Sequence, residues 1–176
     1  MPMKNEKKEF NYVVTYLAQP IYYESVTYFD RDSEFEIIVN RKDDSESERI
    51  VIEKESKKIL EYQKVQDRTQ VISLKYMEND MYLCVKDSDT YMKSRSTFML
   101  PIMFQCQDCF ERSDDGMMVK NILIPDEKMS VLPYNYYCFS NKINIIKPGY
   151  VSLEYSDDGQ LLSLRDFHTR CVKKRI

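Results

Sequence analysis

Two pairs of potential zinc ligands are the residues best suited to chemistry. Cys106 and Cys109 form a C-x-x-C motif, and His168 and Cys171 form a second pair with the same two-residue spacing. Structural zinc takes four nitrogen or sulfur ligands, and two close pairs from distant segments are a common source of them. The sequence predicts a structural zinc site from these four residues. The alternative is that both cysteines pack as small apolar residues and His168 lies on the surface.

Catalytic arrangements have less support in the sequence. His168 is the only histidine, so a thiol nucleophile would have to pair with it, and the spacing does not select one cysteine as its partner. The paired aspartates at 43–44, 114–115 and 157–158 lie in predicted turns, where aspartate is common. The 3 glycines are far apart, which excludes glycine-rich phosphate loops. We predict a non-enzymatic protein with no catalytic residues. A catalytic thiol protein ranks third, behind two non-enzymatic functions.

Aromatic residues provide the second candidate site. The chain has 14 Tyr and 8 Phe but no Trp, and they cluster most densely between 134 and 139. Neighbours in a strand point to opposite faces, so a one-sided sheet cannot bury all of them. Exposed tyrosine is typical of protein interfaces and of base-stacking surfaces. The sequence predicts a partner-binding surface made of Tyr134, Tyr136, Tyr137 and Phe139.

Charge is unevenly distributed along the chain. The net charge is −3, yet residues 165–176 hold five basic residues against Asp166. The acidic remainder disfavours nucleic acid, whereas this basic end suits RNA, DNA or an acidic protein. The alternative is a solvated chain end. In either case we expect deletion of Lys173–Ile176 to leave the fold intact, because chain termini are usually poorly tied down.

The elements that must position these residues are mostly strands. Alternating apolar and polar residues predict hairpins over 72–85 and 151–164, a third over 35–53, and strands near 12–17 and 21–29. The apolar run 98–104 also reads as a strand, and 53–66 and 161–172 are possible helices. The short connections favour antiparallel pairing. We therefore expect a mainly β protein: one antiparallel β-rich domain over 1–176, sandwich or barrel-like, with one or two short helices. A charged N-terminal extension (1–9) and a basic C-terminal end (165–176) flank it.

A short motif occurs twice. Ser113-Asp114-Asp115-Gly116 recurs as Ser156-Asp157-Asp158-Gly159, with similar residues around each copy. Tight hairpin turns select Asp-Gly independently, so common turn chemistry explains the repeat as well as an internal duplication does.

The cellular compartment can be inferred from the number of cysteines and from the pattern of apolar residues. The charged start has no signal-peptide pattern, and no apolar stretch reaches the ~18 residues of a membrane span. The 5 cysteines are odd in number, as expected for reduced thiols. These features predict an intracellular protein, cytoplasmic or nuclear, without membrane contact.

Together these features predict a protein–protein interaction module, an adaptor or scaffold within a larger assembly. The alternative is a zinc-stabilised β-domain that binds nucleic acid through its basic end and exposed aromatics. Zinc is the one cofactor that the sequence suggests. The sequence does not indicate an oligomeric state.

Overall fold

The computed structural model describes residues 5–86, 89–93, 98–112, 116–125 and 129–176. The fold is mainly β, with 65% strand and 5% helix, which confirms the predicted class. Among the described residues, no helix is long and apolar enough to cross a membrane. The chain divides into two compact units, residues 1–10 with 24–97 and residues 11–23 with 98–176, called unit 1 and unit 2 here.

The described chain contains fifteen strands and two short 3-10 helices. Nearly all paired strands are antiparallel, as the short connections predict. The strands are β1 (Glu6–Tyr16), β2 (Gln19–Asp30), β3 (Glu34–Arg41), β4 (Glu46–Glu53), β5 (Ile59–Gln66), β6 (Thr69–Tyr76), β7 (Met81–Val85), β8 (Asp89–Lys93), β9 (Phe98–Met99), β10 (Met118–Leu123), β11 (Val131–Phe139), β12 (Lys142–Lys147), β13 (Val151–Tyr155), β14 (Leu161–Asp166) and β15 (Cys171–Arg175); the helices are η1 (Pro101–Gln105) and η2 (Gln107–Cys109).

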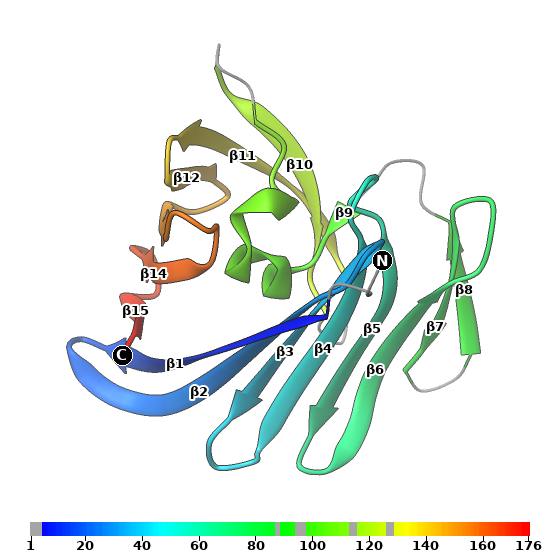
Figure 1. The fold of residues 1–176 in the computed structure, drawn as a ribbon, viewed down its shortest axis with the longest axis horizontal. Helices are drawn as coiled ribbons and strands as arrows, with labels where there is room; N and C mark the ends of the chain where they lie inside the picture. Colours follow the sequence, from blue (N-terminus) through cyan, green and yellow to red (C-terminus); the bar gives the residue numbers. More distant parts are fainter. Residues whose placement is uncertain (1–4, 87–88, 94–97, 113–115, 126–128) are drawn as a thin grey trace. The chain divides into compact units, whose positions relative to one another are not determined.

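Unit 1 is a meander in which each strand from β2 to β8 pairs with the next (Figure 1). One face of this sheet is apolar, because alternate residues of each strand line up across it. Tyr28, Ile37, Ile50, Tyr62 and Leu74 form one such row, and all five side chains are buried. This row explains why the apolar residues of these segments alternate in the sequence.

The opposite face of unit 1 carries an ion-pair ladder. Glu36 is buried although charged, and Arg31 Nη2 lies 2.8 Å from its Oε2. Arg49 on β4 pairs with Glu36 and also with Glu61, whose Oε1 is 3.1 Å from Arg49 Nη1. Cross-strand charge pairs of this kind stabilise neighbouring strands and fix their register.

Unit 2 is a second meander, β10 to β15, followed by antiparallel pairing of β15 with β1 (Figure 1). The short strand β9 pairs parallel to β10 through Phe98 and Met99. Of the residues of β1, those that pair with β15 are Tyr12 to Tyr16. The strand that contains the basic C-terminal residues is therefore paired on both sides, with β14 and with β1.

The core of unit 2 lies between its sheet and the helices η1 and η2. Phe104 and Phe110 form an aromatic cluster with Tyr134 and Tyr136. Tyr155 is fully buried, and its hydroxyl donates a hydrogen bond to the Phe104 carbonyl at 2.9 Å. The helices are tied to the β13–β14 turn by the Gln107 amide, which donates to the Gly159 carbonyl, and they form a covering layer on one face.

Three predicted elements are wrong. Residues 59–66 of the expected helix over 53–66 form β5, and the expected helical segment 161–172 contains β14 and the start of β15. In both cases pairing with two neighbouring strands outweighs weak helix propensity. The apolar run 98–104 is a strand only at Phe98–Met99, because Pro101 begins η1.

Both chain ends differ from the expected extensions. Strand β1 begins at Glu6, inside the segment 1–9 predicted as a charged extension, and the basic end 165–176 contains the end of β14, a turn and β15. Successive side chains of a strand point to opposite faces, so Lys173 lies beside Tyr12 on the buried face while Lys174, also charged, is exposed. These charged residues therefore show no alternation in the sequence.

The second copy of the repeated motif is a hairpin turn. Residues 156–159 join β13 to β14, and Gly159 has a φ of 80°, the left-handed conformation that glycine adopts without strain. Residues 113–115 of the first copy lie outside the described residues. The turn therefore accounts for the second copy by local geometry.

Candidate interaction surface

The four predicted partner-binding residues lie on one strand, β11, but on two faces of it. Tyr136 pairs with the buried Ile145, whereas Tyr137 pairs with Asn144 and Phe139 with Lys142. Side chains alternate along a strand, so Tyr134 and Tyr136 belong to the covered face and Tyr137 and Phe139 to the other, called the outer face of unit 2 here.

On the covered face, Tyr136 is a core residue. It is only 1% exposed, its ring packs edge-on against Phe110, and its hydroxyl donates a hydrogen bond to the Glu111 carbonyl at 3.0 Å. Tyr134 is partly buried against Phe104. Burial raises the pKa of both phenols, so both remain protonated at neutral pH. The prediction that these two residues bind a partner has no support from their position.

On the outer face, Tyr137 and Phe139 stack with ring centroids 6.2 Å apart and an interplanar angle of 24°. Phe139 is 57% exposed. The neighbouring strand adds Val119, which is 56% exposed and pairs with Asn135, and Met117 is also exposed, with its sulfur 3.4 Å from Asn135 Nδ2. We call Met117, Val119, Tyr137 and Phe139 the aromatic surface.

A second aromatic pair lies farther along the outer face. Tyr150 and Phe167 are both exposed and pack edge to face with centroids 5.0 Å apart. The Arg165 guanidinium lies 5.9 Å from the Phe167 ring. This pair was not predicted, although alternation along Ser163, Arg165 and Phe167 places these residues on one face.

Polar side chains fill the positions between the two aromatic pairs. Asn144, Ser152 and Arg165 follow Tyr137 in register across β12, β13 and β14. In the adjacent row, Lys142 lies 3.9 Å from Glu154, and Ser163 and Lys174 follow. The outer face of unit 2 therefore combines exposed aromatics with cations and short hydrogen-bonding side chains.

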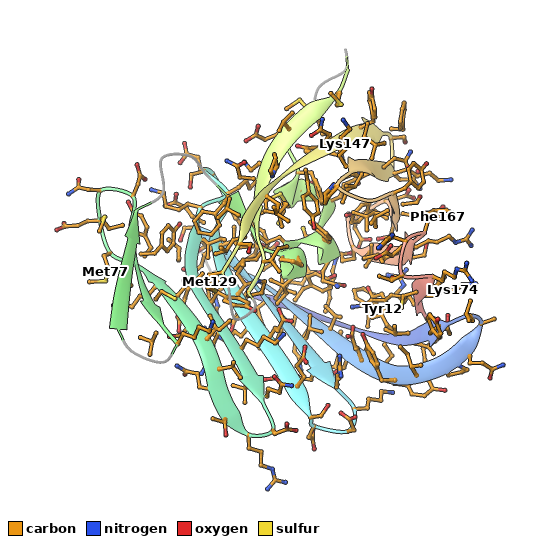
Figure 2. All side chains as sticks on the ribbon, turned by 180° about the vertical axis from the view of Figure 1, so that it is seen from behind. Tyr12, Met77, Met129, Lys147, Phe167 and Lys174 are labelled. Carbon is orange, nitrogen blue, oxygen red and sulfur yellow. The ribbon has the colours of Figure 1, made fainter. Side chains whose placement is uncertain are left out.

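The basic C-terminal residues are divided between the two faces. Lys173 is 8% exposed, with its ammonium 4.8 Å from the centre of the Tyr12 ring, and Tyr12 is itself fully buried. Lys174 projects to the other side of β15 together with Phe167 (Figure 2). Of these two lysines, only Lys174 is available to a partner on the outer face.

The four predicted zinc ligands are not gathered into one site. Cys106 forms an isolated bridge with Gln160, and Cys109 is buried in η2. His168 is exposed in the turn after β14, and Cys171 begins β15 opposite Asp166 and Tyr16. Among the described residues, which include all four, no group of three or more His, Cys, Asp or Glu side chains is suited to hold a metal ion.

The neighbours of the cysteines in the structure do not match the two predicted pairs of zinc ligands. Burial raises the pKa of Tyr155, and the nearby charges of Cys106, Cys109 and Cys138 raise it further. Burial also raises the pKa of the Cys84 and Cys138 thiols, which keeps them protonated at neutral pH. A protonated thiol is a poor nucleophile, so neither cysteine is activated.

A charged cluster in unit 1 is the other unusual group of side chains. The Glu48 carboxylate accepts a hydrogen bond from the Tyr62 hydroxyl at 3.1 Å, and Lys64 lies 3.9 Å from Glu48 and 3.4 Å from Glu46. Burial raises the pKa of Glu48, opposed by the charge of Lys64 and by the Tyr62 hydrogen bond. Glu24 adds a further raising contribution. These contacts join β4 to β5 and give the cluster a structural role.

The raised pKa of Glu48 predicts a pH-dependent effect of Glu48→Gln. Because the folded state binds this proton more tightly than the unfolded chain, ionising Glu48 costs stability as the pH rises above the ordinary glutamate range. Glutamine is neutral at every pH and keeps an acceptor for Tyr62. We expect the variant to gain stability relative to the wild type between pH 4 and pH 7, as measured by urea unfolding.

The control is Glu55→Gln, which removes one negative charge from an exposed side chain in the turn between β4 and β5. A Glu48→Gln variant whose stability relative to the wild type is the same at pH 4 and pH 7 would contradict the raised pKa of Glu48.

Comparison with known proteins adds no family to this description. The chain matches no protein-family model, and no curated protein matches it in sequence.

Proposed function

We propose that this protein is a protein-recognition module that binds its partner through the aromatic surface of unit 2. The single observation that carries the proposal is the stacked, exposed pair Tyr137 and Phe139 beside exposed Val119 and Met117. Large apolar side chains that are exposed together mark interaction sites, and tyrosine is enriched among the residues that dominate binding energy. An adaptor or scaffold within a larger assembly fits this arrangement.

The setting that we propose is the cytoplasm or the nucleus. All five cysteines are reduced thiols, which is the state that a reducing compartment maintains. Nucleic-acid binding is the second candidate function, because Arg165, Lys174 and two aromatic pairs share the outer face. Zinc stabilisation is not part of either proposal, since the four predicted ligands are not grouped.

Replacing Tyr137 and Phe139 together with alanine tests the proposal. We expect partner capture from an extract of the native cell to weaken by at least about tenfold, because truncating a central interface aromatic often costs ~2 kcal/mol or more. The urea midpoint should change little, because the Phe139 ring is mostly solvated. Quantitative mass spectrometry of the captured proteins measures the first quantity, and urea unfolding measures the second.

A photo-reactive benzoylphenylalanine in place of Phe139 identifies the bound protein directly. The same group in place of Met77, an exposed residue of unit 1, is the matched control. Cross-linking from position 139 alone supports the proposal. Equal capture by the wild type and by the double alanine variant would remove the aromatic surface from consideration.

A further inference from the structure

We propose that the outer face of unit 2 binds an acidic, extended segment of a partner protein, with an apolar residue of that segment on the aromatic surface. This inference rests on the proposed function and adds the chemical class of the partner. It is carried by the arrangement of charges along the face, which is independent of the exposure of Tyr137 and Phe139.

The charge of the outer face is positive in an acidic protein. Its outward positions on β11 to β15 hold Lys142, Arg165 and Lys174, against one carboxylate, Glu154. Lys142 is the cation beside Glu154, at 3.9 Å. Arg165 and Lys174 take part in no described ion pair, and both are exposed. They remain to attract carboxylates of a partner.

Arg165 and Lys174 are spaced for an extended chain. In the register of β14 and β15, Ser163 pairs with Lys174 and Arg165 pairs with Val172, so the two cations are diagonal neighbours. Diagonal neighbours on one face of a sheet are about 7–8 Å apart. Alternate residues of an extended segment are about 7 Å apart and point to the same side. Two carboxylates separated by one residue therefore match the two cations.

The aromatic surface lies within reach of the same segment. Tyr137 and Arg165 occupy one row, with Asn144 and Ser152 between them. Three strand spacings of about 4.8 Å separate them by about 14 Å, which an extended chain spans in roughly four residues. Asn144 and Ser152 have short polar side chains, so the backbone of the bound segment between its acids and its apolar residue can lie close to them and form hydrogen bonds with these side chains. The matching segment has two alternate acids and, about four residues away, an apolar residue.

The charge count favours a peptide over single-stranded nucleic acid. A nucleic-acid strand carries a phosphate on every nucleotide and requires several cations for appreciable affinity. The outer face offers two unpaired cations, and unit 2 as a whole has ten basic and ten acidic residues. A segment with two carboxylates is satisfied by two cations, whereas a phosphate backbone is not.

A labelled synthetic peptide tests the inference on the full-length protein. The probe is fluorescein-Glu-Ser-Glu-Thr-Ser-Thr-Leu-Phe, compared by fluorescence anisotropy with the same peptide carrying Gln for both Glu and with a fluorescein-labelled single-stranded RNA octamer. We expect the acidic peptide to bind about threefold to tenfold more tightly than the neutral peptide at low salt, the combined effect of two exposed ion pairs. Added salt should reduce this difference.

Two variants assign the preference to these residues. Arg165→Gln with Lys174→Gln should abolish the preference for acid, whereas Arg68→Gln with Lys75→Gln, which removes two exposed cations from unit 1, should preserve it. Phe139→Ser, at a mostly solvated position, should weaken binding of both peptides. If the two peptides bind equally, or neither binds, the acidic-segment inference is wrong, while the proposed function still stands on partner capture. Tighter binding of the RNA than of the acidic peptide would overturn the choice of partner class.

Discussion

Deleting Lys173–Ile176 is expected to unfold unit 2. These residues form most of β15, whose backbone pairs with β14 through Leu164 and Ser163 and with β1 through Val14, Val13 and Tyr12. The Ile176 amide also donates to the Asn11 carbonyl at 2.9 Å. Each buried backbone group left without a partner costs about 1–3 kcal/mol, and several such losses approach the whole stability of a domain, about 5–15 kcal/mol.

Far-UV circular dichroism and urea unfolding of the truncated chain measure this effect. Lys174→Gln is the control, because it keeps every backbone bond of β15 and alters only an exposed side chain. A truncated protein with the spectrum and urea midpoint of the wild type would mean that β15 is a dispensable tail, as the sequence alone predicts. The pairing of β15 on both sides is the reason that we now expect the opposite.

Replacing Tyr155 with alanine is expected to cost about 3–5 kcal/mol of stability, the range for deleting a large buried aromatic ring. Tyr155 is fully buried, and its hydroxyl holds η1 against the sheet through the Phe104 carbonyl. Tyr155→Phe keeps the ring and removes only the hydrogen bond, so it should cost about 1 kcal/mol. Urea unfolding compares the two variants.

Tyr137→Phe is the matched control, because it removes a hydroxyl from a tyrosine of the outer face and should leave the urea midpoint nearly unchanged. If Tyr155→Ala and Tyr137→Phe had equally small effects on the urea midpoint, the covering layer formed by η1 and η2 would not stabilise unit 2. A large effect for Tyr155 alone supports the division of unit 2 into a covered face and an available outer face.

These variants separate stability from recognition within one sheet. Tyr136 and Tyr137 are adjacent in sequence and chemically identical, yet one contacts Phe110 in the core and the other stacks on exposed Phe139. Variants of Tyr137 and Phe139 therefore report on binding, whereas variants of Tyr136 and Tyr155 report on folding.

The fold class and most strand positions follow from the pattern of residues along the chain. Strict alternation, as in Ile72-Ser73-Leu74, reflects a local property, because successive side chains of a strand point to opposite faces whatever the strand pairs with. The turn at 156–159 was also predictable from the sequence, because Asp-Gly is typical of tight turns and Gly159 adopts the left-handed conformation that such a turn requires. The same alternation implied that Tyr136 and Tyr137 could not both be buried in a one-sided sheet.

Which face of the sheet is covered, and which distant residues meet, depends on the packing of the whole chain. Whether Cys106 and Cys109 approach His168 and Cys171 depends on packing across 59 positions, and the structure instead bridges Cys106 to Gln160 and pairs Cys171 with Asp166 and Tyr16. Residues near the two ends of the chain also meet: β15 pairs with β1, and Lys173 is buried over the Tyr12 ring. Such contacts depend on the packing of whole strands, which local residue patterns do not encode, and this is why a predicted tail is a paired strand and a predicted metal site is dispersed.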